Sequence, residues 1–287
     1  MAFRVLVVTD SASFYSDLEV AFEPLSLFLL HKGTSLLELS ERELSAYWVA
    51  EKINCVVYAG FSLNFDEARL QRFTQSCVAR EIPLMHLSSY QVFDTQQGNI
   101  EEGVTPESSE PLGLSLLAAE NIILEGERNM VLRMPWTLTT CSAALEDEGL
   151  LDRACKALLG TNELQVSDEV AGFVMSWPEV ARAITAMIQQ VFCGAENWGV
   201  FHIRSSDSCS EAEFADAVAR LLKAEGFSVA NVVAVKGAGY LMQRSALLGG
   251  RRSVDDFGIQ QRSFRVGLKG AVQRWVKLSG YIPALAP

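Results

Sequence analysis

Short runs rich in β-branched residues alternate with stretches of helical periodicity along the whole of this chain. The first run covers residues 3–9 (FRVLVVT), and helical spacing follows over 13–24. Strand-like runs recur at 36–39, 53–60, 82–88, 130–136, 163–166, 199–203 and 231–235, and helical stretches recur at 41–52, 66–80, 112–124, 147–159, 178–192, 210–225 and 268–278. This alternation is typical of a parallel sheet with helices on both faces. It predicts an α/β, Rossmann-like doubly wound fold with a smaller α/β lobe.

The chain is long enough for two lobes, since it has 287 residues. We expect a Rossmann-like core over 1–160, and a smaller lobe with a basic C-terminal segment over 161–287. The two are expected to interleave as one unit, because no Pro- or Ser-rich linker separates them. The polar stretch 90–111 predicts a long surface loop. Ser210 and Glu213 predict a capping box at the start of the helix that follows them.

Composition excludes several classes of function. The formal net charge of -11 disfavours nucleic acid and anionic membranes as partners. No run approaches the roughly 18 to 20 apolar residues of a spanning helix, and the N-terminus resembles a strand rather than a signal peptide, so we expect a cytoplasmic protein. The six cysteines and three histidines are scattered, which indicates neither a disulfide framework nor a metal site. His86 and His202 lie in strand-like runs and are expected to be structural.

Positive charge is concentrated near the C-terminus. Residues 236–287 contain nine Lys or Arg against two Asp. Two interpretations stay open: this segment packs on the acidic remainder of the chain, or Arg251 and Arg252 bind a diphosphate. The second rests on the planar guanidinium group, which can hold two phosphate oxygens at once.

The turn after the first run lacks the glycines of a dinucleotide-binding loop. Residues 9–15 are TDSASFY, whereas such a loop needs glycines for a tight turn and for close approach of the pyrophosphate. Asp10 would also place a negative charge beside the phosphates. Ordinary dinucleotide binding is therefore disfavoured. The remaining candidates are Thr9, Ser11 and Ser13 for a phosphate, and Glu38, at the end of the expected second strand, for a ribose.

Five segments share residues with the motifs of one enzyme family. They are 56–68 (VVYAGFSLNFDEA), 86–94 (HLSSYQVFD), Arg133 with Trp136, 168–174 (DEVAGFV) and 199–203 (GVFHI). They resemble, in that order, the N-A-A-A-Y-T-x-V-D-x-A-E, H-x-S-T-D-Y-V-F-D-G, R-T-S-W, D-Q-x-G-x-P-T and G-x-Y-H-x motifs of the dTDP-4-dehydrorhamnose reductase branch of the extended short-chain dehydrogenases. The resemblance implies a Rossmann-like fold, an NAD(P) cofactor and a sugar nucleotide held between the loop after Ser88, residues 168–174 and an arginine of the basic segment.

The catalytic pair of that family falls on two leucines in this chain. The family motif Y-G-x-x-K-L-A-x-E resembles 112–120 (LGLSLLAAE), which puts Leu112 at the tyrosine and Leu116 at the lysine. Neither side chain can transfer a proton. Ser89 matches the helper threonine, and Tyr90 is the nearest surviving acid. The resemblance therefore implies that hydride transfer is lost, with Ser89 and Tyr90 as residual candidates.

Three hypotheses about function follow. The first is a non-catalytic homologue of sugar-nucleotide reductases that acts as a ligand-binding, regulatory or assembly protein without a cofactor. The second is an active NAD(P)-dependent reductase or epimerase with a relocated acid, and the third is a structural subunit with an empty cleft. The first predicts a cleft lined by polar groups such as Ser89 and Arg252, and the third predicts a cleft filled by Tyr15, Leu112 and Leu116.

The ligand and partners follow from the same resemblance. The candidate substrate-binding residues are Ser89, Asp168, Arg251 and Arg252, and the ligand is a sugar nucleotide or another nucleotide. The partners considered are a protein partner and a second copy in a homodimer.

Overall fold

A six-stranded parallel sheet forms the centre of the molecule. The structure is a computed structural model that describes residues 3–25, 27–60, 65–94, 98–139, 149–237, 239–242 and 244–281. The strands run in the order β2-β1-β3-β4-β5-β9. Their bounds are β1 (Phe3–Val8), β2 (Leu27–Lys32), β3 (Cys55–Tyr58), β4 (Leu84–Ser89), β5 (Met130–Met134) and β9 (Gly199–His202). The predicted fold class, α/β and Rossmann-like, is confirmed.

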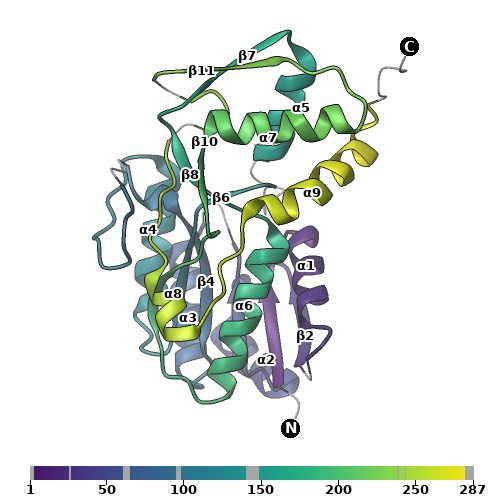
Figure 1. The fold of residues 1–287 in the computed structure, drawn as a ribbon. Coiled ribbons are helices and arrows are strands. Elements are labelled where there is room, and N and C mark those ends of the chain that lie inside the picture. Colours follow the sequence, from purple (N-terminus) through teal and green to yellow (C-terminus); the bar gives the residue numbers. More distant parts are fainter. Residues whose placement is uncertain are drawn as a thin grey trace.

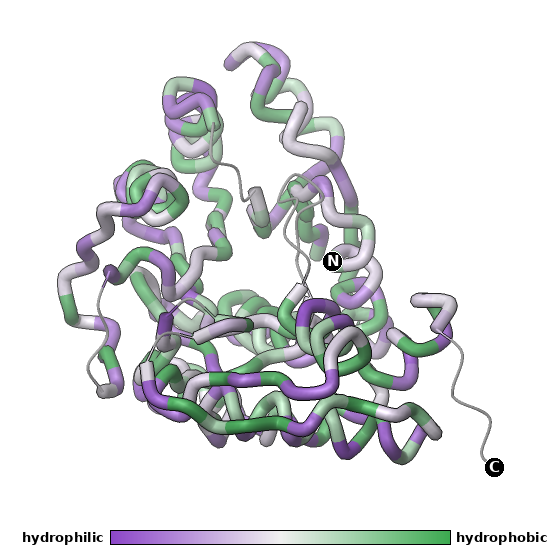
Figure 2. The backbone as a smooth tube through the Cα atoms, turned by 90° about the horizontal axis from the view of Figure 1, so that it is seen from above, coloured by the Kyte–Doolittle hydropathy of each residue, from purple (hydrophilic) through white to green (hydrophobic). Residues whose placement is uncertain are grey.

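Helices cover both faces of this sheet (Figure 1). α1 (Ala12–Phe22) and α6 (Trp177–Phe192) share one hydrophobic cluster with the strands. α2 (Glu41–Glu51), α3 (Glu67–Val78) and α4 (Pro111–Leu124) share the cluster on the other face. Figure 2 shows hydrophobic and hydrophilic residues alternating along the helices, which is the pattern of elements with one face on a core.

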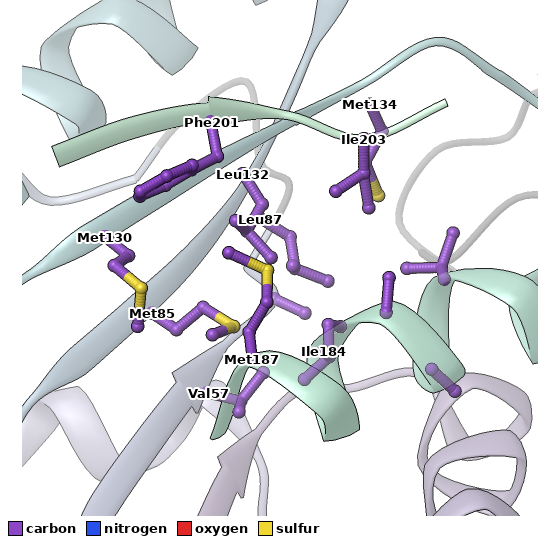
Figure 3. Packing of buried hydrophobic residues seen from close by; sticks show 14 of the residues in the cluster. Val57, Met85, Leu87, Met130, Leu132, Met134, Ile184, Met187, Phe201 and Ile203 are labelled. Atoms are coloured by element: carbon purple, nitrogen blue, oxygen red, sulfur yellow. The ribbon is translucent and has the colours of Figure 1, made fainter. Parts of the chain in front are cut away.

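The core beneath α6 is built from alternate residues of neighbouring strands. Figure 3 shows Met85 of β4 and Leu132 of β5 among the side chains that face Ile184 and Met187 of α6, and all four are fully buried. Burying a side chain of this size contributes about 1.5–3 kcal/mol relative to leaving it exposed. The central strands are buried on both faces, which explains why their sequences are continuous hydrophobic runs.

A second lobe sits beyond the carboxyl ends of the large sheet (Figure 1). Its strands are β6 (Trp136–Thr137), β8 (Ala171–Met175) and β10 (Ser208–Ser210) in one sheet, and β7 (Glu163–Ser167) with β11 (Asn231–Val235) in another. Its helices are α5 (Leu150–Gly160), α7 (Glu211–Ala224) and α9 (Phe264–Ser279), which share their own hydrophobic cluster. The predicted capping box of Ser210 and Glu213 is confirmed at the start of α7.

The chain passes between the lobes several times. It leaves the large sheet after β5, returns at α6 and β9, leaves again for β10 and α7, and returns once more at α8 (Arg251–Phe257) before α9. α5 ends at residue 160 yet packs in the second lobe, and α6 follows residue 160 yet packs on the large sheet. The lobes are thus each assembled from separated pieces of sequence.

Several local predictions were wrong. Residues 36–39 do not form the second strand, because 34–38 make the 3-10 helix η1 (Thr34–Glu38) and the strand is β2, earlier in the chain. β8, β10 and α8 were not predicted. The stretch 90–111 is not simply a surface loop: it begins with the 3-10 helix η2 (Tyr90–Val92), and Phe93 and Ile100 are buried.

Candidate functional site

The turn between β1 and α1 satisfies its own polar groups. Thr9 is buried, and its hydroxyl donates to the carbonyl oxygen of Ala59 (3.2 Å) and accepts from the amide of Ser11 (3.1 Å). The Ser11 hydroxyl in turn accepts from the amide of Phe14 (3.3 Å) and caps α1. Amides at a helix N-terminus bind phosphate only when they are free to donate. Two of these donors are therefore already engaged within the turn.

Asp10 ties the same turn to the end of β2. Its carboxylate accepts from the amide (2.9 Å) and the hydroxyl (2.5 Å) of Thr34. Gly33 passes so close that a Cβ there would lie 2.9 Å from the Asp10 carboxylate. This places a negative charge, held by two donors, in the turn where the family would hold a pyrophosphate. The residues present fit the pyrophosphate of a dinucleotide poorly.

A stacked pair of rings stands beside this turn. Tyr15, at the third glycine position of the family loop, stacks on His31 with ring centroids 4.4 Å apart. Nε2 of His31 lies 2.8 Å from the carbonyl oxygen of Thr9. The aromatic pair therefore replaces the close helix–strand packing that a glycine would permit.

The other predicted cofactor residues lie on the surface. Ser13 is exposed, and its hydroxyl lies 3.3 Å from that of Ser11. Glu38 was expected at the end of a strand, but it ends η1 instead and pairs with Arg69 (2.9 Å). Its carboxylate is thus compensated by α3, and its role toward a ribose stays a prediction.

Ser89 and Tyr90 lie where β4 ends. The Ser89 hydroxyl accepts from the amide of Gln91 (3.3 Å) and caps η2. Tyr90 packs against the hydrophobic clusters of both lobes. Burial raises the pKa of its phenol, and the positive charges of Arg244 and Arg153 oppose that rise. Tyr90 is thus a protonated phenol at the junction of the lobes, with two guanidinium groups near it.

Arg244 and Arg153 reach this junction from different segments. Arg244 donates from Nη1 to the carbonyl oxygen of Phe93 (3.0 Å), and its own carbonyl oxygen accepts from Nε1 of Trp136 (3.2 Å). The Nε of Arg153 is buried and finds no hydrogen-bond partner among the residues that the structure describes. We call Tyr90, Trp136, Arg153 and Arg244 the junction cluster. It presents cationic donors and an aromatic surface next to the end of β4.

The positions of the family's catalytic pair are apolar and packed. Leu116 is buried in the cluster beneath α6, and Leu112 packs against the same cluster. Gly113, between them, lies so close to the Gln91 carbonyl and the Ser108 side chain that no Cβ would fit. α4 therefore packs tightly against η2 and offers no acid or base at these two positions.

A buried polar network lies beneath Ser89. The guanidinium of Arg133 binds the carboxylate of Glu120 through Nη2–Oε2 (2.7 Å) and Nε–Oε1 (3.1 Å), and the Ser88 hydroxyl donates to the same carboxylate (2.5 Å). A bidentate pair of this kind has well-defined geometry. It connects α4, β4 and β5 below the junction cluster.

The two buried histidines are neutral. Burial lowers the pKa of His86 to about 4 and that of His202 to about 3, the latter with a contribution from Arg133. His86 stacks on Tyr58. Nδ1 of His202 lies 2.9 Å from the carbonyl oxygen of Gly249 and 3.1 Å from that of Ile100. Both therefore pack as structural side chains, in line with the sequence analysis.

The remaining predicted binding residues lie away from Ser89. Arg252 donates to the carbonyl oxygens of Val200 (2.8 Å) and Trp198 (3.3 Å) near the start of β9, the end of that strand opposite the second lobe. Arg251 is exposed and pairs with Asp255 within α8. Asp168 is exposed in the turn before β8, whereas the far end of β8 pairs with β6 at the junction. These three residues are not brought together with Ser89 or with each other.

Sequence reasoning missed a buried carboxylate that organises the second lobe. Glu211 is fully buried and accepts from four backbone amides: Ser167 (2.6 Å), Tyr240 (3.1 Å), Leu241 and Met242 (2.7 Å). It holds the segment that leads to Arg244 in place. Its position in the first turn of a helix suggested only a capping residue, so no signal in the sequence singled it out.

Sequence reasoning also counted Arg244 within the basic segment but selected Arg251 and Arg252 instead.

Among the described residues, no group of three or more His, Cys, Asp or Glu side chains could hold a metal ion, and no helix is long and apolar enough to cross a membrane. The free cysteines described are buried except for Cys193, and Cys141 lies outside the described residues. The junction cluster therefore stands out as the candidate site.

One family model matches most of the chain. A family model described as the RmlD substrate binding domain matches residues 60–276. No curated protein matches the sequence. Among solved structures, a dTDP-4-dehydrorhamnose reductase ortholog from Clostridium acetobutylicum superposes with a TM-score of 0.76 at 14% identity, covering 95% of this chain and 99% of that one.

Two further structures are similar over nearly their whole length. The dTDP-4-dehydrorhamnose reductase of Bacillus anthracis, solved in complex with NADP, gives a TM-score of 0.74 at 14% identity and covers 93% of this chain and 97% of its own. MoeE5, solved with UDP-glucuronic acid and NAD, gives 0.72 at 17% identity, with 96% and 99% covered. At such identities these likenesses show the fold.

Proposed function

The chain belongs to the RmlD substrate binding domain family, and from this premise we propose that it binds a sugar nucleotide without reducing it. In this proposal the protein keeps the fold of sugar-nucleotide reductases and epimerases and serves as a ligand-binding, regulatory or assembly protein. The Bacillus anthracis reductase is described with NADP, and MoeE5 is described with UDP-glucuronic acid and NAD, which supports a ligand of the nucleotide class.

The observation that carries the proposal is the junction cluster. Arg153 and Arg244 bring guanidinium groups to Tyr90 from two different segments. Leaving a buried donor such as the Arg153 Nε unsatisfied costs about 1–3 kcal/mol, and an anionic ligand oxygen would offset this cost. Guanidinium groups bind diphosphates bidentately. Arg244 therefore takes the place that the sequence analysis gave to an arginine of the basic segment.

The proposed loss of reductase activity rests on two places in the structure, the positions of Leu112 and Leu116 and the turn from Thr9 to Tyr15. Leu112 and Leu116 supply no proton, and Tyr90 has a raised pKa with no lysine beside it in the family's arrangement. The turn from Thr9 to Tyr15 engages its own donors and holds the carboxylate of Asp10 near the expected phosphates. We therefore propose that no dinucleotide cofactor is required.

The test is ligand binding by the purified full chain. Thermal shift and titration calorimetry with UDP-glucose, UDP-glucuronic acid, dTDP-glucose, NADH and NADPH compare the two ligand classes, since a ligand that binds only the native state raises the Tm. We expect a sugar nucleotide to raise the Tm and the dinucleotides to leave it unchanged. No shift with any sugar nucleotide would contradict the proposal and favour a structural subunit.

Variants locate the site. Arg244→Gln is expected to weaken sugar-nucleotide binding about tenfold or more, because a hydrogen bond to a charged group contributes roughly 1.5–3 kcal/mol. Arg251→Gln is the matched control, since its side chain is 84% exposed and pairs only with Asp255 among the described residues. Loss of binding in the control alone would instead place the diphosphate at α8.

The active-enzyme alternative makes a separate prediction. Tyr90 would act as the relocated acid, so oxidation of NADPH in the presence of a dTDP-4-keto sugar would be measurable and would disappear in Tyr90→Phe. Such turnover would replace the binding proposal with a reductase. Its absence, together with a sugar-nucleotide shift, supports a binding protein.

A further inference from the structure

A cavity of about 700 Å³ lies between elements of the two lobes. It is lined by one face of α9, the start of α5, the N-terminal turn of α6 and the middle of α1. Tyr90, Arg153 and Arg244 do not line it. A volume of this size suits a small organic ligand.

Aromatic rings with fixed orientations form part of its wall. The indole N–H of Trp177 donates to the carbonyl oxygen of Thr139 (3.0 Å), and that of Trp275 donates to the carboxylate of Asp152 (2.7 Å). Tyr281 stacks on Trp275 with ring centroids 5.3 Å apart. Trp177 is only 2% exposed, so the ring surface that the wall offers a ligand comes from Trp275 and Tyr281.

Glycines open the α9 side of the cavity. Gly267 and Gly270 both line it. A Cβ at Gly270 would have no heavy atom within 4 Å, so this position faces empty space. Glycine inside a helix costs about 0.5–1 kcal/mol relative to alanine. The width of the cavity thus depends on residues that are unfavourable for the helix itself.

The charges of the lining are mostly compensated. Asp152 is bound by Lys156 (2.9 Å) and by the indole of Trp275. Glu179 is bound by Arg182 (2.9 Å) and Arg262 (3.4 Å).

Arg274 of α9 and Asp17 of α1 remain. Within the described chain Arg274 forms no hydrogen bond or ion pair, although its charge acts on Asp17. Burial raises the pKa of Asp17 and the charge of Arg274 lowers it, burial being the larger cause. The cavity therefore combines the stacked rings of Trp275 and Tyr281 with a guanidinium whose five donors have no partner in the described protein.

We propose that this cavity binds a flat aromatic molecule that carries one negative charge, with its rings on Trp275 and Tyr281 and its anionic group on Arg274. A guanidinium holds a carboxylate, sulfonate or phosphate oxygen pair in its plane, which fixes the orientation of such a ligand. The site is separate from the junction cluster, so it does not depend on the proposed sugar-nucleotide binding.

The experiment uses two fluorescent probes on the full chain. 8-Anilinonaphthalene-1-sulfonate is an aromatic anion, and N-phenyl-1-naphthylamine has the same ring system without the sulfonate. We expect one molecule of the anionic probe to bind per chain, about tenfold or more tightly than the neutral probe. Equal affinity for the two probes would overturn the proposal.

Variants assign the probe to this cavity. Gly270→Trp fills the open space and should abolish binding. Gly160→Trp is the control: a Cβ at Gly160 would also meet no heavy atom within 4 Å, but Gly160 does not line the cavity, so binding should be unchanged. Circular dichroism checks that each variant is folded, and Gly270→Leu replaces Gly270→Trp if that variant does not fold. Unchanged binding in the folded Gly270 variant would refute the assignment.

The sign of the charge effect is tested separately. Arg274→Gln should weaken the anionic probe about tenfold without affecting the neutral one. Asp17→Asn removes the opposing charge and should strengthen the anionic probe. If Asp17→Asn weakens binding of the anionic probe instead, the cavity does not favour a negative charge and the proposal is wrong.

Discussion

Arg133 and Glu120 form a bidentate ion pair in the interior of the protein, with only 3% and 2% of their side chains exposed. The pair joins β5 to α4, and the hydroxyl of Ser88 adds β4 to the same carboxylate. Both residues stand at positions that resemble motif positions of the family, as do Leu112 and Leu116 on the same helix as Glu120. Taking one charge away would leave the other buried without compensation.

Glu120→Gln is expected to lower the free energy of unfolding by about 3–5 kcal/mol, because the guanidinium of Arg133 would lose its counter-charge. Urea denaturation followed by circular dichroism measures the change. Glu125→Gln, an exposed position at the end of the same helix, is the control and should change stability by less than about 0.5 kcal/mol. Similar losses in both variants would refute the role of the buried pair.

Glu211→Gln should both destabilise the protein and weaken sugar-nucleotide binding. The carboxylate accepts four amides, including those of Tyr240 and Met242 just before Arg244. An amide side chain has one acceptor oxygen, so at least two of these donors would lose a partner, at about 1–3 kcal/mol each. Calorimetric titration with UDP-glucose reports the binding. Glu213→Gln, in the exposed capping box, keeps a side-chain oxygen that can accept from the amide of Ser210, so it should change stability little and leave binding intact.

Gly113→Ala is expected to lower stability by about 1–3 kcal/mol through overpacking of α4 against η2. The added methyl group would meet the backbone carbonyl of Gln91, which cannot move without shifting η2. Gly160→Ala, with open space around its Cβ, should be neutral or slightly stabilising. Thermal melts of both variants measure the change. An unchanged Tm in Gly113→Ala would show that η2 can shift to accommodate the added methyl group at little cost.

Acid should destabilise the protein in a defined range of pH because of His86. Its pKa is lowered from 6.5 to about 4, so the unfolded chain binds the proton more readily than the folded one. Stability is unaffected by this group above about pH 6.5 and falls between about 6.5 and 4, by about 3 kcal/mol in all. His86→Phe keeps a ring beside Tyr58 and should reduce the slope of this part of the pH profile of the unfolding free energy. The slope that remains is due to His202, whose pKa is lowered to about 3. An unchanged slope would mean that His86 is not responsible.

The sequence predicted the sheet well because its central strands are buried on both faces. Their hydrophobic runs need no information from distant residues. The second strand was misplaced because its position depends on a tertiary contact: Asp10 holds Thr34 and so starts a 3-10 turn over Leu36 and Leu37. α8 was missed because a seven-residue helix rich in charge has little hydrophobic periodicity.

The candidate site was predictable only in part. Ser89 and Tyr90 were located because they end a strand that the motifs identify. Arg153 was not predictable, since an arginine on an amphipathic helix is normally a solvent-exposed residue. Arg251 and Arg252 were chosen for their chemistry, yet α8 places them beside the start of β9 rather than near Ser89. Which arginine reaches the junction depends on the course of the chain after β11, and local sequence does not encode that.

The interleaving of the lobes also bears on synthesis of the protein. β9 is the last strand of the large sheet, and the whole of α5, β7, β8 and α6 is made between β5 and β9. A nascent chain that ends before Gly199 therefore carries β5 with one hydrogen-bonding edge open. Open strand edges of this kind invite pairing with other chains. We expect chains that stall or terminate early on the ribosome to depend on chaperones, whereas the finished protein covers that edge with its own later sequence.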